Sequence, residues 1–215
     1  MIGTEEVLEV LSDDHSLADL CRYFGNGPEQ APFAGSRFNS LEPNDRDRIT
    51  ASDVVAVHCL SVTIPIDVTL DLLEGALVTD VAGFLADIPD DVDLGSHATK
   101  AHIVRGAPAD RVWHLLDAET VVGWVTAGKL LARKRPRLLP VYDTIVRCAL
   151  GKPAPGTVWA SYHRLLQSTD VIERLDGLHR QAGLLPEVPR LRVLDVVLWM
   201  RHRHAHRPGA CPGLS

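Results

Sequence analysis

Apolar and polar positions in the first part of the chain follow a helical period. From Ile2 to Leu20, apolar residues alternate with acidic ones at the spacing of an amphipathic helix. The adjacent Asp13 and Asp14 mark a point at which this helix divides into two. The stretch that follows, residues 25–44, is rich in Gly, Pro, Asn and Ser and is predicted to be a loop.

A continuously apolar run, residues 54–62, comes directly after a helix-capping signal. Thr50 or Ser52 supplies a side-chain oxygen that caps exposed amides, so we expect a helix that is buried on most sides. The many β-branched residues of this run make a strand the competing prediction. Further helices are predicted over residues 65–77 and 79–88.

The second half of the chain continues the helical pattern, with prolines between the segments. The predicted helices cover residues 108–117, 124–134, 144–150, 157–168, 170–183 and 189–204. The acidic stretch 89–101 contains glycine and is the best candidate for a boundary between lobes. We therefore predict an all-α fold with two helical lobes, residues 1–100 and 101–204, and a flexible tail over 205–215.

Composition adds few constraints to this prediction. Hydrophobic residues make up 46% of the chain and charged residues 23%, as in ordinary globular domains. The most apolar region, residues 54–73, is interrupted by charged residues and a proline, so we expect no membrane-spanning segment. The acidic start differs from a secretory signal. We expect a cytoplasmic protein with no membrane partner.

The four cysteines lie far apart and form no C-x-x-C pair. They are Cys21, Cys59, Cys148 and Cys211. In a cytoplasmic protein we expect reduced thiols that fill the core, and the spacing does not suit an iron–sulfur cluster. We expect neither a metal nor an organic cofactor.

The formal net charge of −6 conceals two halves of opposite sign. Residues 1–100 contain 19 acidic and 5 basic residues, a net charge of −14, whereas residues 101–215 contain 9 acidic and 17 basic residues, a net charge of +8. Such an asymmetry indicates an anionic partner for the basic half. The packing of acidic helices against basic ones within the chain explains it equally well.

The segment from Ala118 to Leu150 carries the most specific pattern. A helix is predicted to end near Asp117, a tight turn follows at Val122-Gly123, and a new helix begins near Thr126. Two helices joined in this way expose backbone N–H groups at the start of the second helix, where the helix dipole also favours a phosphate oxygen. Such a contact positions a DNA duplex without reading its sequence.

This segment resembles the helix-hairpin-helix DNA glycosylase superfamily. The family's hairpin has the form Leu-Pro-Gly-Val-Gly-x-x-Thr-Ala, and Pro-x-x-Asp-Thr-x-Val-x-Arg follows after a short interval. The residues of this chain that fall on the two patterns are Val122, Gly123, Thr126 and Ala127, then Pro140, Asp143, Thr144, Val146 and Arg147. The family's first hairpin glycine is Val121 here, and a β-branched residue avoids positive φ.

The resemblance implies removal of a flipped base from DNA. The carboxylate of Asp143 would stabilise positive charge on the sugar and accept a proton from the attacking water. Bifunctional members carry a nucleophilic lysine 18 residues before the aspartate, at the place of Val125 in this chain. Valine forms no Schiff base, and Lys129 is not assigned that role, so the implied activity is monofunctional.

The same resemblance supplies the other candidate site residues. Trp124 and Tyr142 are candidate walls of a base pocket, since a flipped base stacks on aromatic faces. The candidate DNA contacts are Val122, Gly123, Val125, Thr126, Lys129, Arg133, Lys134, Arg135 and Arg147. Arg133, Lys134 and Arg135 belong to a dense basic run beside the hairpin, and a solvated helix end is the alternative interpretation of that run.

Two further patterns have ordinary explanations. Asp143 follows an extended stretch and precedes an apolar helix, so a plain N-cap explains its position without catalysis. His202, His204 and His206 alternate with other residues, a spacing that suits an extended tail better than one helical face. We interpret the tail as a solvated terminus rather than a metal or nucleic-acid site.

The whole chain also looks like an uncharacterised bacterial domain family, a resemblance that implies no activity. The preferred function is DNA repair by a hydrolase: DNA binding through the hairpin, with base excision assisted by Asp143. One alternative is a non-catalytic helix-hairpin-helix module that binds DNA or RNA. Another is a helical protein–protein interaction factor.

Overall fold

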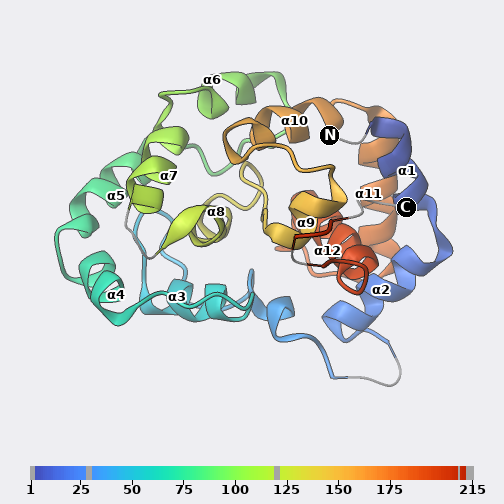
Figure 1. Ribbon diagram of the computed structural model, residues 1–215, viewed down its shortest axis with the longest axis horizontal. Helices are drawn as coiled ribbons and strands as arrows, with labels where there is room; N and C mark the ends of the chain where they lie inside the picture. The colour runs from blue at the N-terminus through green and yellow to red at the C-terminus, as the bar shows by residue number, and fades with distance from the viewer. Residues whose placement is uncertain (1–2, 28–30, 119–121, 208, 212–215) are drawn as a thin grey trace. The chain divides into compact units, whose positions relative to one another are not determined.

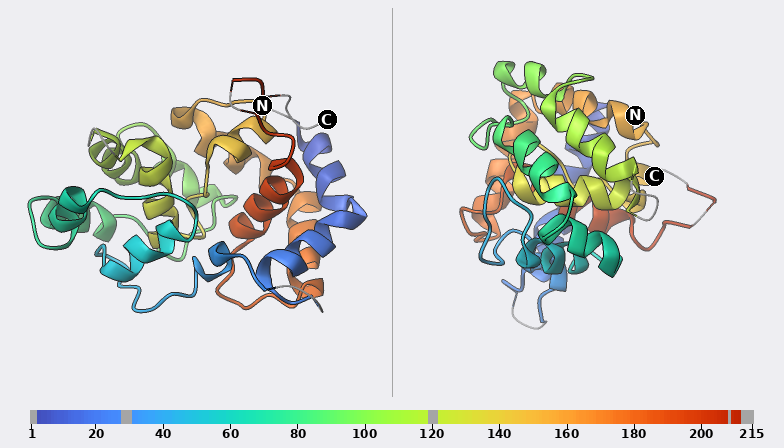
Figure 2. Two further views of the ribbon diagram at one scale, coloured as in Figure 1. Left: turned by 60° about the horizontal axis from the view of Figure 1, so that its bottom comes forward. Right: turned by 90° about the vertical axis from the view of Figure 1, so that its left-hand side faces the viewer.

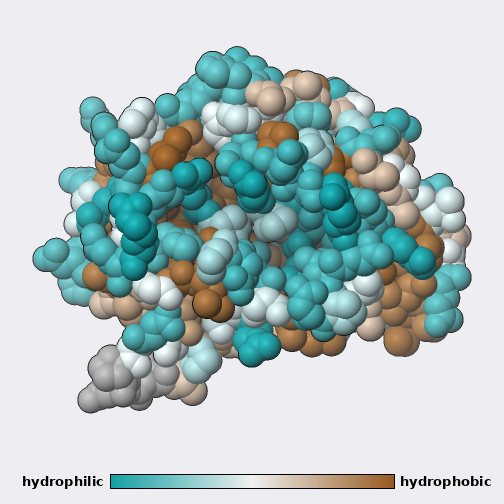
Figure 3. All heavy atoms as spheres, turned by 180° about the vertical axis from the view of Figure 1, so that it is seen from behind, coloured by the Kyte–Doolittle hydropathy of each residue, from teal (hydrophilic) through white to brown (hydrophobic). Residues whose placement is uncertain are grey.

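A computed structural model describes residues 3–27, 31–118, 122–207 and 209–211. Within these ranges the regular structure consists of α-helices and short 3-10 helices, without a strand. The predicted all-α fold is therefore confirmed. The described residues also contain no helix with the length and apolar character needed to cross a membrane. Figure 3 shows polar atoms over most of the face that it draws, with apolar patches between them.

The described residues fall into two compact units that are discontinuous in sequence. Unit 1 contains residues of 1–33 and 141–215 together with the short segment 94–96, and unit 2 contains 34–93 and 97–140. This division differs from the predicted lobes, 1–100 and 101–204. It arises because the N-terminal helices pack against the last two helices of the chain rather than against their neighbours in sequence.

Unit 1 is built around its last helix. Its elements are α1 (Thr4–Ser12), α2 (Asp14–Phe24), α9 (Thr144–Ala149), η3 (Pro155–Thr157), α10 (Val158–Leu165), α11 (Thr169–Gln181) and α12 (Arg190–His202). Helix α12 packs against α1, α2, α9 and α11 and is buried along almost its entire length (Figures 1 and 2). The predicted division of the first helix is confirmed, because Asp13 ends α1 and its side chain caps the amide of His15 in α2.

Unit 2 is built around α8 (Figure 1). Its elements are η1 (Ala34–Arg37), α3 (Ala51–His58), α4 (Ile66–Leu73), α5 (Leu77–Ala86), η2 (His97–Thr99), α6 (Lys100–Ile103), α7 (Pro108–Ala118) and α8 (Gly123–Lys134). Helix α8 packs against α3 and α7. The helix predicted after Thr50 is confirmed as α3, with a capping box in which the Asp53 carboxylate accepts from the Thr50 backbone N–H at 2.8 Å.

Two of the four cysteines form a pair in unit 1. The Sγ atoms of Cys148 and Cys211 lie in bonding contact, and the two Cα atoms are 5.7 Å apart. Cys21 and Cys59 are free thiols in partly buried positions. The expectation that the four cysteines lie apart from one another is therefore wrong for Cys148 and Cys211, whose sulfur atoms meet. Their 63-residue separation in sequence concealed the pair.

Candidate functional site

Asp143 caps the start of α9. Its backbone is extended, with φ −115° and ψ −175°, and its Oδ1 accepts the backbone N–H groups of Ile145 at 3.0 Å and Val146 at 2.9 Å. Val141 and Tyr142 before it have no regular structure, and the helix that follows places its first amides at the Asp143 carboxylate. The capping interpretation of Asp143 is therefore confirmed, and the side chain is partly exposed.

Tyr142 and Arg147 both reach the backbone of the segment after α9. The Tyr142 hydroxyl donates to the Pro153 carbonyl at 2.6 Å, and Arg147 Nε donates to the same oxygen at 3.4 Å. Tyr142 is only 4% exposed, and burial raises the pKa of its hydroxyl above the ordinary value. The expectation that Tyr142 forms the open wall of a base pocket is corrected, because its ring is buried and its hydroxyl is engaged.

A buried polar cluster that sequence reasoning missed lies in the same unit. Arg192 and Asp195 of α12 form an ion pair, and Arg192 Nη2 also donates to the Tyr23 hydroxyl at 2.5 Å. Burial opposes the charged form of Arg192, but Tyr23 and Asp195 outweigh it and raise the pKa of the guanidinium. The signal was present in the sequence: two opposite charges, three residues apart, interrupt an otherwise apolar helical run.

Tyr162 of α10 is a further buried polar residue of unit 1, only 1% exposed. Its hydroxyl is buried without a hydrogen-bond partner among the described residues. Burial raises the pKa of Tyr162 first, and the negative charges of Asp195 and Asp143 raise it further. A buried phenol of this kind is suited to orienting a polar ligand or a water molecule.

The structure describes the two ends of the segment that connects α7 to α8, while residues 119–121 lie outside the described residues. Helix α7 ends at Ala118, and α8 begins at Gly123, which is exposed and has φ +66°. Val122 is buried, and Val121 lies outside the described residues. A positive φ is strained for any residue with a β-carbon, so the backbone explains why glycine occupies position 123.

The side chains of early α8 are less exposed than a DNA-contacting surface requires. Trp124 and Val125 are partly buried, and Thr126 is buried. Lys129 is buried as well, and its Nζ donates to the Leu60 carbonyl at 2.9 Å. The expectation that Lys129 contacts DNA is therefore corrected, because its ammonium group has an internal partner.

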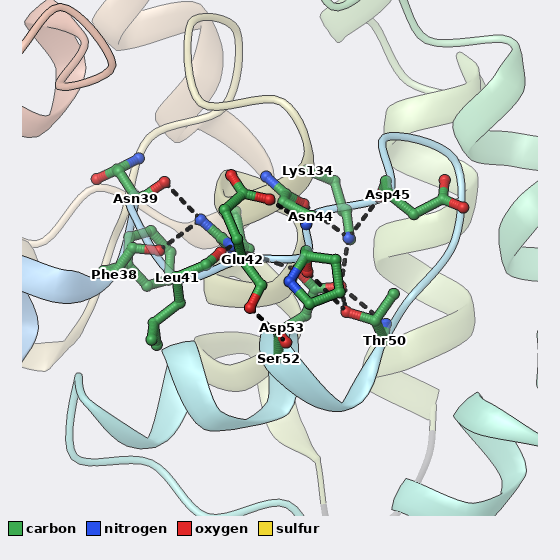
Figure 4. A network of polar contacts seen from close by, with 12 residues as sticks. Phe38, Asn39, Leu41, Glu42, Asn44, Asp45, Thr50, Ser52, Asp53 and Lys134 are labelled. Atoms are coloured by element: carbon green, nitrogen blue, oxygen red, sulfur yellow. Dashed lines mark hydrogen bonds and ion pairs between the residues drawn. The ribbon is translucent and has the colours of Figure 1, made fainter.

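The basic run at the end of α8 is buried in unit 2, and Figure 4 shows Lys134 among its polar partners. Arg133, Lys134 and Arg135 are 1%, 3% and 0% exposed. Their donors satisfy backbone carbonyls and carboxylates of loops far away in sequence. The expectation that these three cations contact phosphate is corrected, since none of them presents its charge to the surface.

Arg133 and Lys134 share one fully buried carboxylate, that of Asp53. Arg133 Nε lies 3.2 Å from Asp53 Oδ1, and Lys134 Nζ pairs with Oδ2. Arg133 Nη1 also donates to the carbonyls of Phe38 at 2.8 Å and Asn39 at 2.7 Å. Burial lowers the pKa of Lys134, and the Asp53 carboxylate opposes that shift.

Arg135 holds two further segments. Its guanidinium donates to the carbonyls of Ile88 at 2.7 Å, Arg46 at 2.5 Å and Leu85, and it pairs with the Asp47 carboxylate at 2.7 Å. Together the three cations tie the loop over residues 38–47 and the end of α5 to α8. Their function in unit 2 is structural.

The described residues define an all-helical protein with a capping aspartate at the start of α9 and a left-handed glycine at the start of α8. The chain belongs to a family of unknown function, DUF6308, whose model matches residues 16–202. This confirms the resemblance to an uncharacterised family. Neither a search of curated proteins nor a search of solved structures found a match. These comparisons give no support to the glycosylase resemblance, which stays an interpretation of residues 118–150.

Removing the Asp53 charge tests the structural role of the basic run. We expect Asp53→Asn to lower the free energy of unfolding by about 3–5 kcal/mol, because it leaves two buried cations without their carboxylate. Urea unfolding followed by circular dichroism measures the change. Asp93→Asn is the matched control: the Arg137–Asp93 pair is exposed, so its loss should change stability by at most about 1 kcal/mol. Equal effects of the two variants would contradict the proposed role of Asp53.

Proposed function

We propose that the protein binds duplex DNA through the start of α8 in unit 2. We further propose that Asp143 of unit 1 assists the removal of a base, without a cut in the backbone. The observation that carries this proposal is the left-handed Gly123 at the start of α8, at the place of the family's second hairpin glycine. A left-handed residue there turns the chain sharply into α8. The helix dipole then favours a phosphate oxygen beside the first amides of α8.

The burial of the basic run changes the form of this proposal. Arg133, Lys134 and Arg135 do not supply cations, so the backbone contact rests on amides and on the helix dipole. Neutral donors release few counterions from DNA. Binding by this route is therefore weak and only shallowly dependent on salt, and its specificity comes from the extruded base rather than from the duplex sequence.

The proposed chemistry uses Asp143 as the carboxylate beside the sugar. Its negative charge stabilises the oxocarbenium-like transition state, and an oxygen accepts a proton from the attacking water. The two hydrogen bonds that Oδ1 accepts from backbone N–H groups hold the carboxylate in one orientation. This supports a role in which the carboxylate must be fixed beside the sugar. Val125 at the lyase position limits the reaction to hydrolysis and leaves an abasic site as the product.

A substitution at Gly123 tests the DNA contact. Gly123→Ala should weaken binding to a short duplex about tenfold, because the strained β-carbon position redirects the first amides of α8. Fluorescence anisotropy at several salt concentrations measures the affinity. Gly106→Ala is the control: Gly106 also has positive φ, +83°, and an added β-carbon meets no atom within 4 Å at either position. Equal affinities of the two variants would argue against a contact at α8.

A conservative change at Asp143 tests the chemistry. Asn is as good an N-cap as Asp, so Asp143→Asn should keep α9 folded while it removes the charge. We expect the release of a damaged base from duplex DNA, read out as alkali-labile abasic sites, to fall at least about a hundredfold. Asp13→Asn, at the cap of α2, is the matched control and should leave the rate unchanged. An undiminished rate in Asp143→Asn would rule out the mechanism.

A second candidate function is a non-catalytic nucleic-acid-binding module. The observation that favours it is the use of the Asp143 carboxylate as a helix cap, which explains this residue without chemistry. The same assays separate the two candidates. Binding that depends on Gly123, with no abasic sites from any damaged duplex tested, would support the non-catalytic module.

A further inference from the structure

Four side chains with metal-binding atoms converge in unit 1. Cys148 comes from α9, His202 is the last residue of α12, and His206 and Cys211 follow in the segment after it. One donor atom from each of the four lies within 4.8 Å of the others. Within the cluster, His202 Nε2 lies 2.9 Å from Cys148 Sγ. Cys148 and His202 are each only 2% exposed, so the cluster reaches into the interior.

The two histidines converge because the chain continues its helical turn beyond α12. The His206 backbone N–H donates to the His202 carbonyl at 2.9 Å, which is an i,i+4 bond, and the two ring centroids are 6.2 Å apart. His204, between them, is exposed. The alternating pattern had indicated an extended tail. The local turn instead brings together the pair spaced by four residues, the spacing that places two side chains on one helical face.

The His206 side chain provides a second observation that points to a ligand at this cluster. Its Nδ1 is buried and has no hydrogen-bond partner among the described residues. Leaving a polar nitrogen buried without a partner is energetically unfavourable, and a bound metal ion would satisfy it. A pairing of Cys148 with Cys211 alone accounts for the sulfur atoms. It does not explain why two imidazoles meet at the same point with one nitrogen unsatisfied.

We propose that Cys148, His202, His206 and Cys211 bind one structural Zn²⁺ ion. Two thiolates and two imidazoles are a donor set that zinc binds in a tetrahedron, with Zn–S bonds of about 2.3 Å and Zn–N bonds of about 2.0–2.1 Å. In such a tetrahedron the donor atoms are roughly 3.3–3.8 Å apart. The 4.8 Å limit on the observed separations includes these distances, so the cluster accommodates the ion once the two sulfurs separate.

Four protein ligands fill the coordination sphere, so this ion has a structural role rather than a catalytic one. Each thiol releases its proton to the solvent when it binds the metal. The ion joins the segment after α12 to the last turn of α9. Since Asp143 caps the first turn of the same short helix, metal binding stabilises the element that presents Asp143.

The test uses the full chain, purified under reducing conditions without chelator. Elemental analysis should find about one zinc per chain, because a closed four-ligand site holds a single ion. Unfolding in the presence of a chelator should then release four titratable thiols. Replacement of zinc by Co²⁺ should give the visible absorption of tetrahedral cobalt and a sulfur-to-cobalt charge-transfer band. These readouts need neither DNA nor activity, so their outcome is separate from that of the proposed function.

Substitutions assign the ligands. His202→Ala and His206→Ala should each reduce the bound zinc at least about tenfold after dialysis, since a tetrahedral site loses a ligand. His204→Ala, in the same segment but exposed, should retain it. Cys148→Ser should lose zinc, whereas Cys59→Ser should not. Where a ligand variant fails to fold, the stoichiometry and the cobalt spectrum of the unaltered chain decide.

Three results would overturn the proposal. A metal-free chain with two titratable thiols would mean a disulfide only. Four free thiols that take up neither added ZnCl₂ nor Co²⁺ would leave no site. Equal loss of zinc in His204→Ala and His206→Ala would mean adventitious binding by the histidine-rich tail.

Discussion

The negative charge of the Asp53 carboxylate offsets the desolvation cost of two buried cations, and the organisation of unit 2 depends on this pairing. Desolvating an ammonium or guanidinium group costs several kcal/mol, which must be offset by a counter-charge and by hydrogen bonds. Arg133 and Lys134 obtain the charge from Asp53 and the remaining bonds from carbonyls of the loop before α3. Because the loop is irregular, these bonds also give its carbonyls the partners that a strand or helix would provide. One buried carboxylate thus fixes both α8 and the loop beside it.

This arrangement explains why the prediction of a phosphate-binding surface at the basic run was wrong. Three consecutive cations beside a hairpin are typical of a phosphate-binding surface, and nothing local distinguishes them from buried ones. Their acceptors lie between residues 38 and 53 and between 85 and 88, about 45 to 95 residues earlier in the chain. Most are backbone carbonyls, which every residue possesses and no pattern marks. In the sequence Asp53 stands within a helix-capping signal, and nothing there marks its carboxylate as the partner of both cations.

Local features could be predicted from the sequence where the residues that produce them lie close together in the chain. The break at Asp13, the start of α3 after Thr50 and the cap at Asp143 each depend on a polar side chain that reaches amides two or three residues away. The grouping of helices into units was not predictable in this way, since it depends on which apolar faces pack together. The Arg192–Asp195 pair was visible as a charged interruption of an apolar helix, but its partner Tyr23 lies 169 residues earlier. The contact between His202 and His206 could not be predicted, because it depends on a helical turn that continues past residue 202.

Helix α9 connects the two proposals for unit 1. It has six residues, and an isolated helix of that length does not persist in water. Two constraints within the unit hold it: the Asp143 carboxylate satisfies amides at its start, and Cys148 near its end belongs to the cluster with the α12 histidines. Packing against α12 supplies the apolar contact between these ends. A carboxylate placed on a short, doubly anchored helix has a more fixed orientation than one on a free loop, which is the physical requirement for either catalysis or specific binding. If zinc occupies the cluster, a metal rather than a larger hydrophobic core fixes this orientation in the protein, and Asp143 is the residue whose position the metal secures.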